Sequence, residues 1–391
     1  MPSLSTRADV ETAVAQRYSA GAQEVQPALC CPVDYDPRFL AVIPEEVLER
    51  DYGCGDPSRY LVEGGTVLDL GCGAGKICFI ASQVVGAAGR VIGVDLNDDM
   101  LALARGAAPV VAQRIGHDNV EFRKGRIQDL ALDLDALDRW LASHPVTDVA
   151  TLATLEAEQR RLRAEQPLVA DGSVDAVVSN CVLNLVATEH KEQLFAETFR
   201  VLRRGGRAVI SDIVSAVEVP DHLCADPELW SGCISGAYQE EAFLAAVERA
   251  GFYGVHLVKR DSTPWRVVDS IEFRSVTVIA YKGKQGECRD HGQAVIYSGP
   301  FKAVLDDDEH VFPRGVPTAV CAKSLEIYSR EPYAGAFHLL EPAVAVDPAT
   351  APLFDCAPQT APPTPTEPAS VVRRAVSGLT TAGGHATTGC C

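Results

Sequence analysis

The sequence predicts an α/β protein with a doubly wound parallel sheet, and three observations predict this fold class. Short apolar runs alternate with helical patterns from residue 65 onward, a spacing typical of βαβ units. A glycine-rich segment at residues 71–75 follows the first apolar run, as in the first turn of such units. The chain has 391 residues, 47% of them apolar and 23% charged, so it is long enough for two domains with cores.

Each expected element of the sheet follows from its local pattern. The strands are short apolar runs, and the helices are stretches with helical apolar spacing. In chain order we expect a strand at 66–70, a helix from the glycine loop to 85, a strand at 90–95, a helix at 98–106, strands at 120–123 and 173–180, a helix at 189–202 and a strand at 207–212. The charged, helical stretch 133–166 lies where a short loop would suffice, so we interpret it as an insertion with a solvated face.

The segments outside these strands suggest four parts along the chain. Apolar spacing predicts short helices at 8–19 and 45–50, and β-rich runs such as SVTVIAY, QAVIYSG and KSLEIYS follow residue 252. A tail dominated by Pro, Thr and Ala cannot bury a core, so we expect it to be disordered. The expected parts are an N-terminal segment with a cap helix at 1–50, the main domain at 51–252, a smaller α+β domain at 253–345 and the tail at 346–391.

Charge excludes some classes of partner. With 35 basic and 53 acidic residues, the formal net charge is −18, and such a surface repels nucleic acid and anionic lipid. No run approaches the 18 to 20 apolar residues of a membrane span. The N-terminus lacks the apolar region of a secretory signal, so we expect a cytoplasmic protein with neither nucleic acid nor membrane as partner.

The segment VLDLGCGAGK at residues 67–76 is the main candidate for ligand binding. A glycine-rich turn between a strand and a helix lets the backbone approach a ligand closely. Position 76 is Lys where a dinucleotide fingerprint has its third Gly, and the flanking spacing does not fit a Walker loop. Asp69 would repel a pyrophosphate, so the motif favours a cationic ligand such as the amino group and sulfonium of S-adenosylmethionine.

A second acid supports this interpretation. Asp95 ends the second expected strand, where a carboxylate can bond both ribose hydroxyls. The arrangement resembles class I S-adenosylmethionine-dependent methyltransferases, which implies a Rossmann-like sheet. By this resemblance Ile127 and Gln128 contact adenine, with core packing the alternative for Ile127, and Asn180 faces the methionine end. The implied cofactor-binding residues are Asp69, Gly71, Gly73, Asp95, Ile127, Gln128 and Asn180.

Cysteine is unusually frequent, with 13 residues in the chain. Disulfides are rare in the cytoplasm, so such thiols are more often buried, metal-binding or catalytic. Several fall in loops: Cys30 or Cys31, Cys54 in YGCGDP, Cys181 in SNCVLNLV and Cys233 in WSGCISGA. Cys181 directly follows the fourth expected strand, where substrates of this fold meet the methyl donor. Thiolates from separate loops can converge there on a soft, thiophilic centre.

These cysteine segments carry a more specific resemblance. YGCG, SNCVLNLV, SDIVS and SGCISGA, together with the Cys390–Cys391 ending, resemble arsenite methyltransferases over about residues 30–330. The resemblance implies that Cys54, Cys181 and Cys233 ligate trivalent arsenic. It also implies that Cys30 or Cys31, of which we favour Cys30, takes part in thiol redox steps. These four cysteines are the expected catalytic set. Cys72 departs from that set, and we expect it to fill the glycine turn. We assign no role to Cys224, Cys288, Cys321 and Cys356.

The resemblance implies an enzyme that transfers the methyl group of S-adenosylmethionine to cysteine-bound trivalent arsenic, which detoxifies arsenite. A thiol reductant, glutathione or thioredoxin, would restore cysteines oxidised in turnover. Two other functions remain open. The chain could be a methyltransferase for an organic small molecule, with Asp212 the best candidate base, or a non-catalytic metalloid-binding protein.

Overall fold

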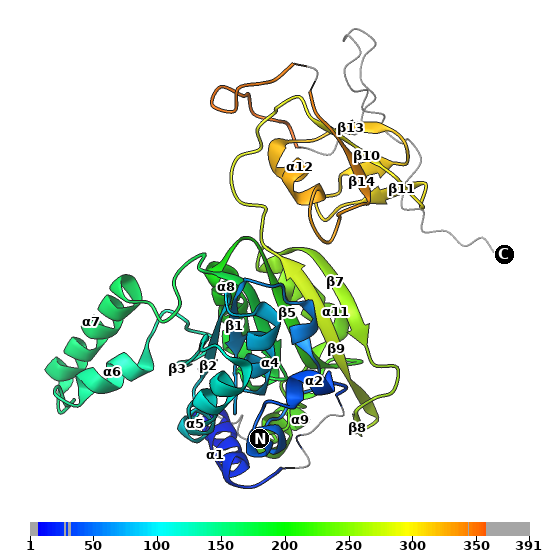
Figure 1. Cartoon of the computed structure of the whole chain (residues 1–391). Coiled ribbons are helices and arrows are strands. Elements are labelled where there is room, and N and C mark those ends of the chain that lie inside the picture. Colours follow the sequence, from blue (N-terminus) through cyan, green and yellow to red (C-terminus); the bar gives the residue numbers. More distant parts are fainter. Residues whose placement is uncertain (1–6, 27–28, 30–32, 343, 357–391) are drawn as a thin grey trace. The chain divides into compact units, whose positions relative to one another are not determined.

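The computed structural model describes residues 7–26, 29, 33–342 and 344–356. Cys30, Cys31, Cys390 and Cys391 lie outside the described residues, as does the expected tail from residue 357. The chain divides into two compact units, Met1–Lys282 and Gly283–Cys391 (Figure 1). Each unit has its own sheets, and each is described separately below.

A mixed sheet forms the centre of the first unit. Its strands are β1 (Thr66–Leu70), β2 (Arg90–Asp95), β3 (Val120–Lys124), β4 (Val174–Asn180), β5 (Leu202–Ser215), β6 (Tyr238–Gln239), β7 (Tyr253–Arg260), β8 (Arg266–Val268) and β9 (Ile271–Tyr281). The order is β3-β2-β1-β4-β5-β9-β7, with β6 beside β5 and β8 beside β9. Strands β1 to β5 are parallel, whereas β9 is antiparallel to β5 and β7. The expected α/β fold class is confirmed.

Helices cover both faces of this sheet. The α-helices of the unit are α1 (Arg7–Gln23), α2 (Pro37–Leu40), α3 (Glu45–Glu49), α4 (Lys76–Val85), α5 (Asp98–Ile115), α6 (Leu134–Leu141), α7 (Val149–Glu165), α8 (Lys191–Val201), α9 (Asp221–Cys224), α10 (Pro227–Ser231) and α11 (Glu240–Arg249). Helices α4 and α5 lie on one face, and α8 and α11 lie on the other (Figure 1). The sheet is therefore doubly wound.

Side chains that point alternately to the two faces of the sheet form the core between the sheet and the helices. Leu68 and Leu70 on β1 are 0% and 2% exposed, and they belong to one apolar cluster with Phe195 of α8 and Phe243 of α11. Neighbouring residues on a strand point to opposite faces, so Val67 and Asp69 face the α4 side. The strand thereby buries apolar residues on one face and brings an acid to the other.

The stretch predicted to be a helical insertion, residues 133–166, forms α6 and α7. The two helices extend from the sheet beside β3 as a separate arm (Figure 1). Leu132, Leu137 and Leu162 give the arm a small apolar cluster of its own.

Two expectations for the C-terminal part differ from the structure. The boundary expected between residues 252 and 253 falls inside the central sheet, because β7 and β9 extend that sheet beyond β5. The run KSLEIYS at 323–329, expected to be β-rich, lies mostly in α12 (Ala322–Tyr328). There Leu325 and Tyr328, three positions apart, are both buried on one helix face, and Cys321 caps the helix by accepting a hydrogen bond from the Ser324 amide.

The second unit is a small α+β structure. Besides α12 it contains β10 (Ala294–Tyr297), β11 (Ala303–Leu305), β12 (Val311–Pro313), β13 (Pro317–Ala319) and β14 (Phe337–Leu340). One antiparallel sheet has the order β13-β10-β14, and β11 pairs with β12. Rings of Phe312, Tyr328 and Phe337 pack against one another with centroids 4.8 to 5.2 Å apart. These aromatic contacts supply much of its core. Among the described residues, no helix is both long and apolar enough to cross a bilayer.

The packing of β1 yields a stability prediction. Leu68→Ala removes a fully buried side chain between sheet and helices, and we expect the free energy of unfolding to fall by about 2–5 kcal/mol. Urea unfolding at 25 °C measures this change. Val149→Ala, at a position that is 83% exposed, is the control and should change stability by less than about 0.5 kcal/mol. Equal midpoints for the two variants would contradict the assigned core.

Candidate active site

A cavity opens at the carboxyl ends of the parallel strands. It encloses about 1150 Å³, part of it open to solvent. Strand β1 lies between β2 and β4, so the chain reverses its winding direction here, which is where open α/β sheets bind ligands. The lining includes all seven residues expected to bind the cofactor, together with Cys181: Asp69, Gly71, Gly73, Asp95, Ile127, Gln128 and Asn180.

The glycine loop after β1 needs its glycines for two reasons. Gly71, Gly73 and Gly75 have φ values of 66°, 51° and 92°, a region that other residues adopt at a cost. A Cβ at Gly71 would also collide with Val182, and one at Gly75 would lie 2.8 Å from the ring of Phe122. A Cβ at Gly73 would meet only open space and Asp51 at 4.0 Å, so this backbone lies open to a ligand.

Asp95 connects this loop to the turn after β2. Its carboxylate accepts hydrogen bonds from the amides of Gly73 and Asn97, both at 2.8 Å. Burial raises the pKa of Asp95, and these amide donors partly offset that rise. The acid is therefore fixed in the cavity wall, with its remaining oxygen lone pairs available to hydroxyl groups of a ligand.

Asp69 is the second acid of the wall and is only 2% exposed. Burial raises its pKa to about 8, although a hydrogen bond from Cys78 at 3.2 Å opposes the shift. A ligand that carries positive charge would favour the carboxylate form of Asp69. Lys76, which follows the loop, is held at 2.7 Å by Asp51 in a buried ion pair, so it is not available to phosphate. These residues fit a sulfonium and ammonium ligand such as S-adenosylmethionine.

The adenine contacts expected from the sequence lie on the same wall. Ile127 and Gln128 line the cavity beside Met100. Ile127 is 7% exposed and also belongs to the apolar cluster of the sheet. Ile127 therefore both lines the cavity and packs in the core of the sheet.

Three cysteines from distant segments meet at the edge of this cavity. Cys54, Cys181 and Cys233 are 1%, 7% and 4% exposed and belong to one cluster. The sulfurs of Cys54 and Cys181 lie within 4.8 Å of each other and of a carboxylate oxygen of Asp212. The thiol of Cys233 donates to the carbonyl oxygen of Cys181 at 3.1 Å. The fold thus gathers the three cysteines expected to ligate arsenic.

Backbone strain coincides with two of these thiols. Cys181 has φ of 62° and Cys233 has φ of 61°, although neither is glycine. Left-handed backbone at such residues costs of order 1–3 kcal/mol and clusters at functional sites. At Cys181 the strained residue directly follows β4, and its amide donates to Ser211 of β5 at 2.8 Å. The chain therefore leaves the sheet at Cys181, directly after β4.

Asn180 holds the Cys54 loop against the end of β4. Its side-chain oxygen accepts hydrogen bonds from the amides of Cys54 and Gly55, both at 3.0 Å. Ser275 of β9 donates to the carbonyl of Cys54 at 2.6 Å. A Cβ at Gly53 would collide with Asn180, so glycine allows the close approach. Asn180 lines the cavity as expected, but this clamp on the loop was not foreseen.

Helix α1 supplies a part of the site that the sequence did not reveal. Burial raises the pKa of Tyr18, with further increases from the neighbouring Cys233 and Cys181 thiols, and its hydroxyl is hydrogen-bonded to Cys233. The helix is tied down at both sides of the cavity: Arg17 donates to Ser231 of α10 at 2.9 Å, and Asn97 donates to the carbonyl of Ala15 at 3.1 Å. The sequence predicted a short helix at 8–19 but not its position at the cavity.

Two other groups near the site are held in structural roles. Asp212 accepts hydrogen bonds from the amides of Leu183 at 2.9 Å and Ile213 at 2.7 Å. Burial raises its pKa to about 6. Cys72 is 3% exposed within the glycine turn, and burial raises its pKa to about 11, so it is a neutral thiol at physiological pH.

A sheet in this order, with a glycine loop after β1 and an acid at the end of β2 on one cavity, defines a class I S-adenosylmethionine-dependent methyltransferase. A family model described as a methyltransferase domain matches residues 61–251. An arsenite methyltransferase of Aquipseudomonas alcaligenes is 31% identical over 335 residues, which cover 81% of this chain and 86% of the relative. The chain belongs to the arsenite methyltransferase family.

Other relatives agree with this assignment. An arsenite methyltransferase of Halobacterium salinarum is 37% identical over 213 residues, covering 54% of this chain and 44% of the relative. The crystal structure of an arsenic(III) S-adenosylmethionine methyltransferase from Chlamydomonas reinhardtii matches with a TM-score of 0.54 and 26% identity, over 83% of this chain and 100% of that one. A second family model, described as a domain of unknown function, matches residues 284–370.

The raised pKa of Asp69 predicts how cofactor binding depends on pH. Below about pH 8 the empty site holds a proton on Asp69, and a cationic ligand must displace it. Raising the pH from 6 to 7.5 should therefore tighten S-adenosylmethionine binding by roughly tenfold or more. Calorimetry across this range tests the prediction.

Asp69→Asn is the control for this titration. It should bind the cofactor more weakly, with a much flatter pH dependence. A wild-type affinity that does not change with pH would show that Asp69 does not exchange a proton for the ligand.

Proposed function

We propose that this chain transfers the methyl group of S-adenosylmethionine to trivalent arsenic held by Cys54, Cys181 and Cys233. One observation carries the proposal: three buried cysteines, distant in sequence, belong to one cluster beside the cavity that suits the methyl donor. The sulfurs of Cys54 and Cys181 lie within 4.8 Å of each other, and the Cys233 thiol donates to the Cys181 carbonyl. Soft thiolates select soft, thiophilic centres. Arsenite is what the relatives' names specify as substrate.

The first step is ligand exchange at arsenic. Arsenous acid, As(OH)₃, reacts with three cysteine thiols to give three As–S bonds and three waters, without a change of oxidation state. The protons released from the thiols leave in those waters. Tyr18 stays neutral because its pKa is raised, so it can donate its hydrogen bond to the sulfur of Cys233. The buried sulfurs then hold arsenic in one position at the cavity edge.

The second step is methyl transfer. The arsenic lone pair attacks the methyl carbon of S-adenosylmethionine, the bond from that carbon to the positively charged sulfur breaks, and neutral S-adenosylhomocysteine leaves with the electron pair. Asp69, Asp95 and the backbone at Gly73 hold the donor, while the cysteines fix the arsenic lone pair towards it. Confining two reactants in this way contributes several kcal/mol to lowering the barrier. The nucleophile loses no proton, so the site needs no general base.

The reaction also needs a thiol reductant, because methyl transfer oxidises arsenic by two electrons. When the arsenic lone pair forms the As–C bond, arsenic goes from the trivalent to the pentavalent state. A return to trivalent arsenic takes two electrons, which two cysteine thiolates supply by forming a disulfide. Glutathione or thioredoxin then reduces that disulfide. We assign Cys30, outside the described residues, to these steps, and we place the reaction in the reducing cytoplasm.

A methyltransferase for an organic nucleophile is the less favoured alternative, because such a reaction needs a base. Asp212 is the nearest candidate to the thiols, but two backbone amides already donate to its carboxylate. Its position suits a residue that braces the turn after β4. A protein that only binds metalloid would not need the cofactor cavity.

Replacement of one thiol tests the proposal directly. Cys181→Ser should reduce methylation of arsenite at least about 100-fold, because one of three arsenic ligands is lost, while S-adenosylmethionine still binds. Mass spectrometry of the arsenic products and calorimetry of the cofactor measure the two effects.

Cys224→Ser is a matched control for this variant. Cys224 packs against the cluster, and its thiol lies 3.5 Å from two acceptors, the carbonyls of Val219 and Ser235, to which a serine hydroxyl can also donate. This variant should keep most of the activity. Normal turnover by Cys181→Ser would rule out the proposed ligand set.

The hydroxyl of Tyr18 gives a second prediction. Tyr18→Phe removes the hydrogen bond to Cys233 while it keeps the ring that packs against Tyr52 at 6.1 Å. A hydrogen bond between neutral groups contributes about 0.5–1.5 kcal/mol, so arsenite affinity should fall by about two- to tenfold. Titration with arsenite and with S-adenosylmethionine separates this effect from a loss of fold, since cofactor affinity should not change. Unaltered arsenite affinity would remove Tyr18 from the site.

A further inference from the structure

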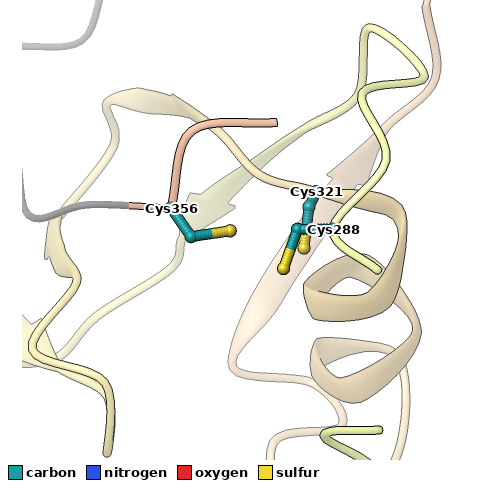
Figure 2. Close-up of side chains that lie close together, drawn as sticks. All are labelled: Cys288, Cys321 and Cys356. Carbon is teal, nitrogen blue, oxygen red and sulfur yellow. The ribbon is translucent and has the colours of Figure 1, made fainter. Parts of the chain in front are cut away.

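The second unit contains a thiol cluster of its own. Cys288, Cys321 and Cys356 come from three separate segments, and their sulfur atoms all lie within 4.8 Å of one another. Figure 2 shows the Cys288 and Cys321 side chains next to each other and that of Cys356 pointing towards them. Gaps of 33 and 35 residues (288 to 321 and 321 to 356) carry no metal-binding motif. The spacing of these cysteines therefore does not predict a role for them.

Backbone hydrogen bonds bring the three segments together. Arg289 and Leu353 form an antiparallel bridge, and the amide of Phe354 donates to the carbonyl of Cys288 at 2.7 Å. The amide of Ala322, the first residue of α12, donates to the carbonyl of Arg289 at 2.9 Å. The cluster therefore lies at a junction that the fold itself specifies.

The Cys356 and Lys323 side chains lie beside the Cys288 thiol and act on its pKa. Burial raises the pKa of Cys288, but hydrogen bonds from Cys356 and Lys323 outweigh it, and the pKa ends below the usual value. Burial and the hydrogen bond to Cys288 raise the pKa of Cys356 to about 12.

Within the part of the chain that the structure describes, the donor set contains three soft sulfurs and no fourth ligand. Among the described residues, the group includes no histidine and no carboxylate. His310 lies nearby, but both of its ring nitrogens are engaged: Nδ1 with Asp306 and Nε2 with the carbonyl of Cys356, each at 2.9 Å. Structural zinc sites take four protein ligands, whereas trivalent arsenic bonds to three sulfurs and keeps a lone pair.

We propose that Cys288, Cys321 and Cys356 form a second binding site for trivalent arsenic, separate from the site of methyl transfer. Arsenous acid exchanges its three hydroxyl groups for the three sulfurs, so that three As–S bonds form, three As–O bonds break and three waters leave. No electrons are transferred, and the product is neutral. The inference does not depend on methyl transfer at the first site.

Geometry and access both suit this ligand. The three sulfurs all lie within 4.8 Å of one another, so small rotations of the side chains are enough for them to share one centre. Cys321 is 1% exposed, whereas Cys288 and Cys356 are half-buried. A small neutral molecule can therefore reach two thiols from solvent and then the third.

Arsenic counts on the full-length protein test the proposal. The reduced protein is incubated with arsenite, passed through a desalting column and analysed for arsenic per chain by mass spectrometry. Cys288→Ser and Cys181→Ser should each lower the count by one, and the double variant by two. Cys321→Ser should also lower it by one. Serine is a favoured N-cap, so this variant keeps the cap of α12.

The two single variants serve as controls for each other. If only Cys288→Ser lowers the number of arsenic atoms per chain, the second site is supported and the proposed ligand set of the first site is wrong. If Cys181→Ser alone lowers it, the second site is overturned. Melting curves equal to that of the wild type establish that the variants are folded.

Two further measurements distinguish arsenic from other occupants of the cluster. X-ray absorption of arsenic bound to the Cys181→Ser variant should show sulfur in the arsenic coordination shell. A second substitution at Cys288, Cys321 or Cys356 in that variant should reduce the amount of sulfur around arsenic. The proposal is overturned if added zinc instead occupies the cluster and blocks arsenic, or if the reduced protein forms a disulfide within the cluster that excludes arsenite.

Discussion

The two hydrogen bonds that Asn180 accepts from the Cys54 loop are the constraint on which the active site depends. They join a segment that precedes the first strand to the end of β4. Although 126 residues separate Asn180 from Cys54, these bonds and the one from Ser275 to the carbonyl of Cys54 fix Cys54 relative to Cys181. The same side chain lines the methyl-donor cavity. One side-chain amide therefore helps to set the position of the Cys54 thiol relative to the cavity.

The cysteine cluster requires strained backbone at two of its residues and close backbone contacts that only glycine allows. Cys181 and Cys233 both adopt left-handed conformations, and a Cβ at Gly55 would lie 2.5 Å from Ser211. The surrounding sheet and hydrogen bonds over-determine these conformations, as strained functional residues require. The pocket is therefore built before any ligand enters.

Local sequence patterns predict the parallel strands and the two acids that follow them. They do not predict which residues from distant segments come together in space. The alternating strands, Asp69 and Asp95 follow from period and spacing, because each is defined within one βαβ unit. The meeting of Cys54, Cys181 and Cys233 depends on strand order, so only a family resemblance suggested it. Strand β9 has the local pattern of any buried strand, and nothing in residues 271–281 shows that it pairs with β5. The cluster at Cys288 needs three segments folded together, which spacing alone does not reveal.

The wide separation of the active-site cysteines also affects biosynthesis. Cys54 leaves the ribosome 179 residues before Cys233 (54 to 233), which is about 10–35 s at about 5–20 residues per second. During that interval the pocket does not exist, and the nascent polypeptide carries thiols that no tertiary structure yet separates. A trivalent arsenical can bridge whichever sulfurs are near each other. With arsenite as its substrate, the enzyme must complete translation and folding before that substrate cross-links the emerging chain.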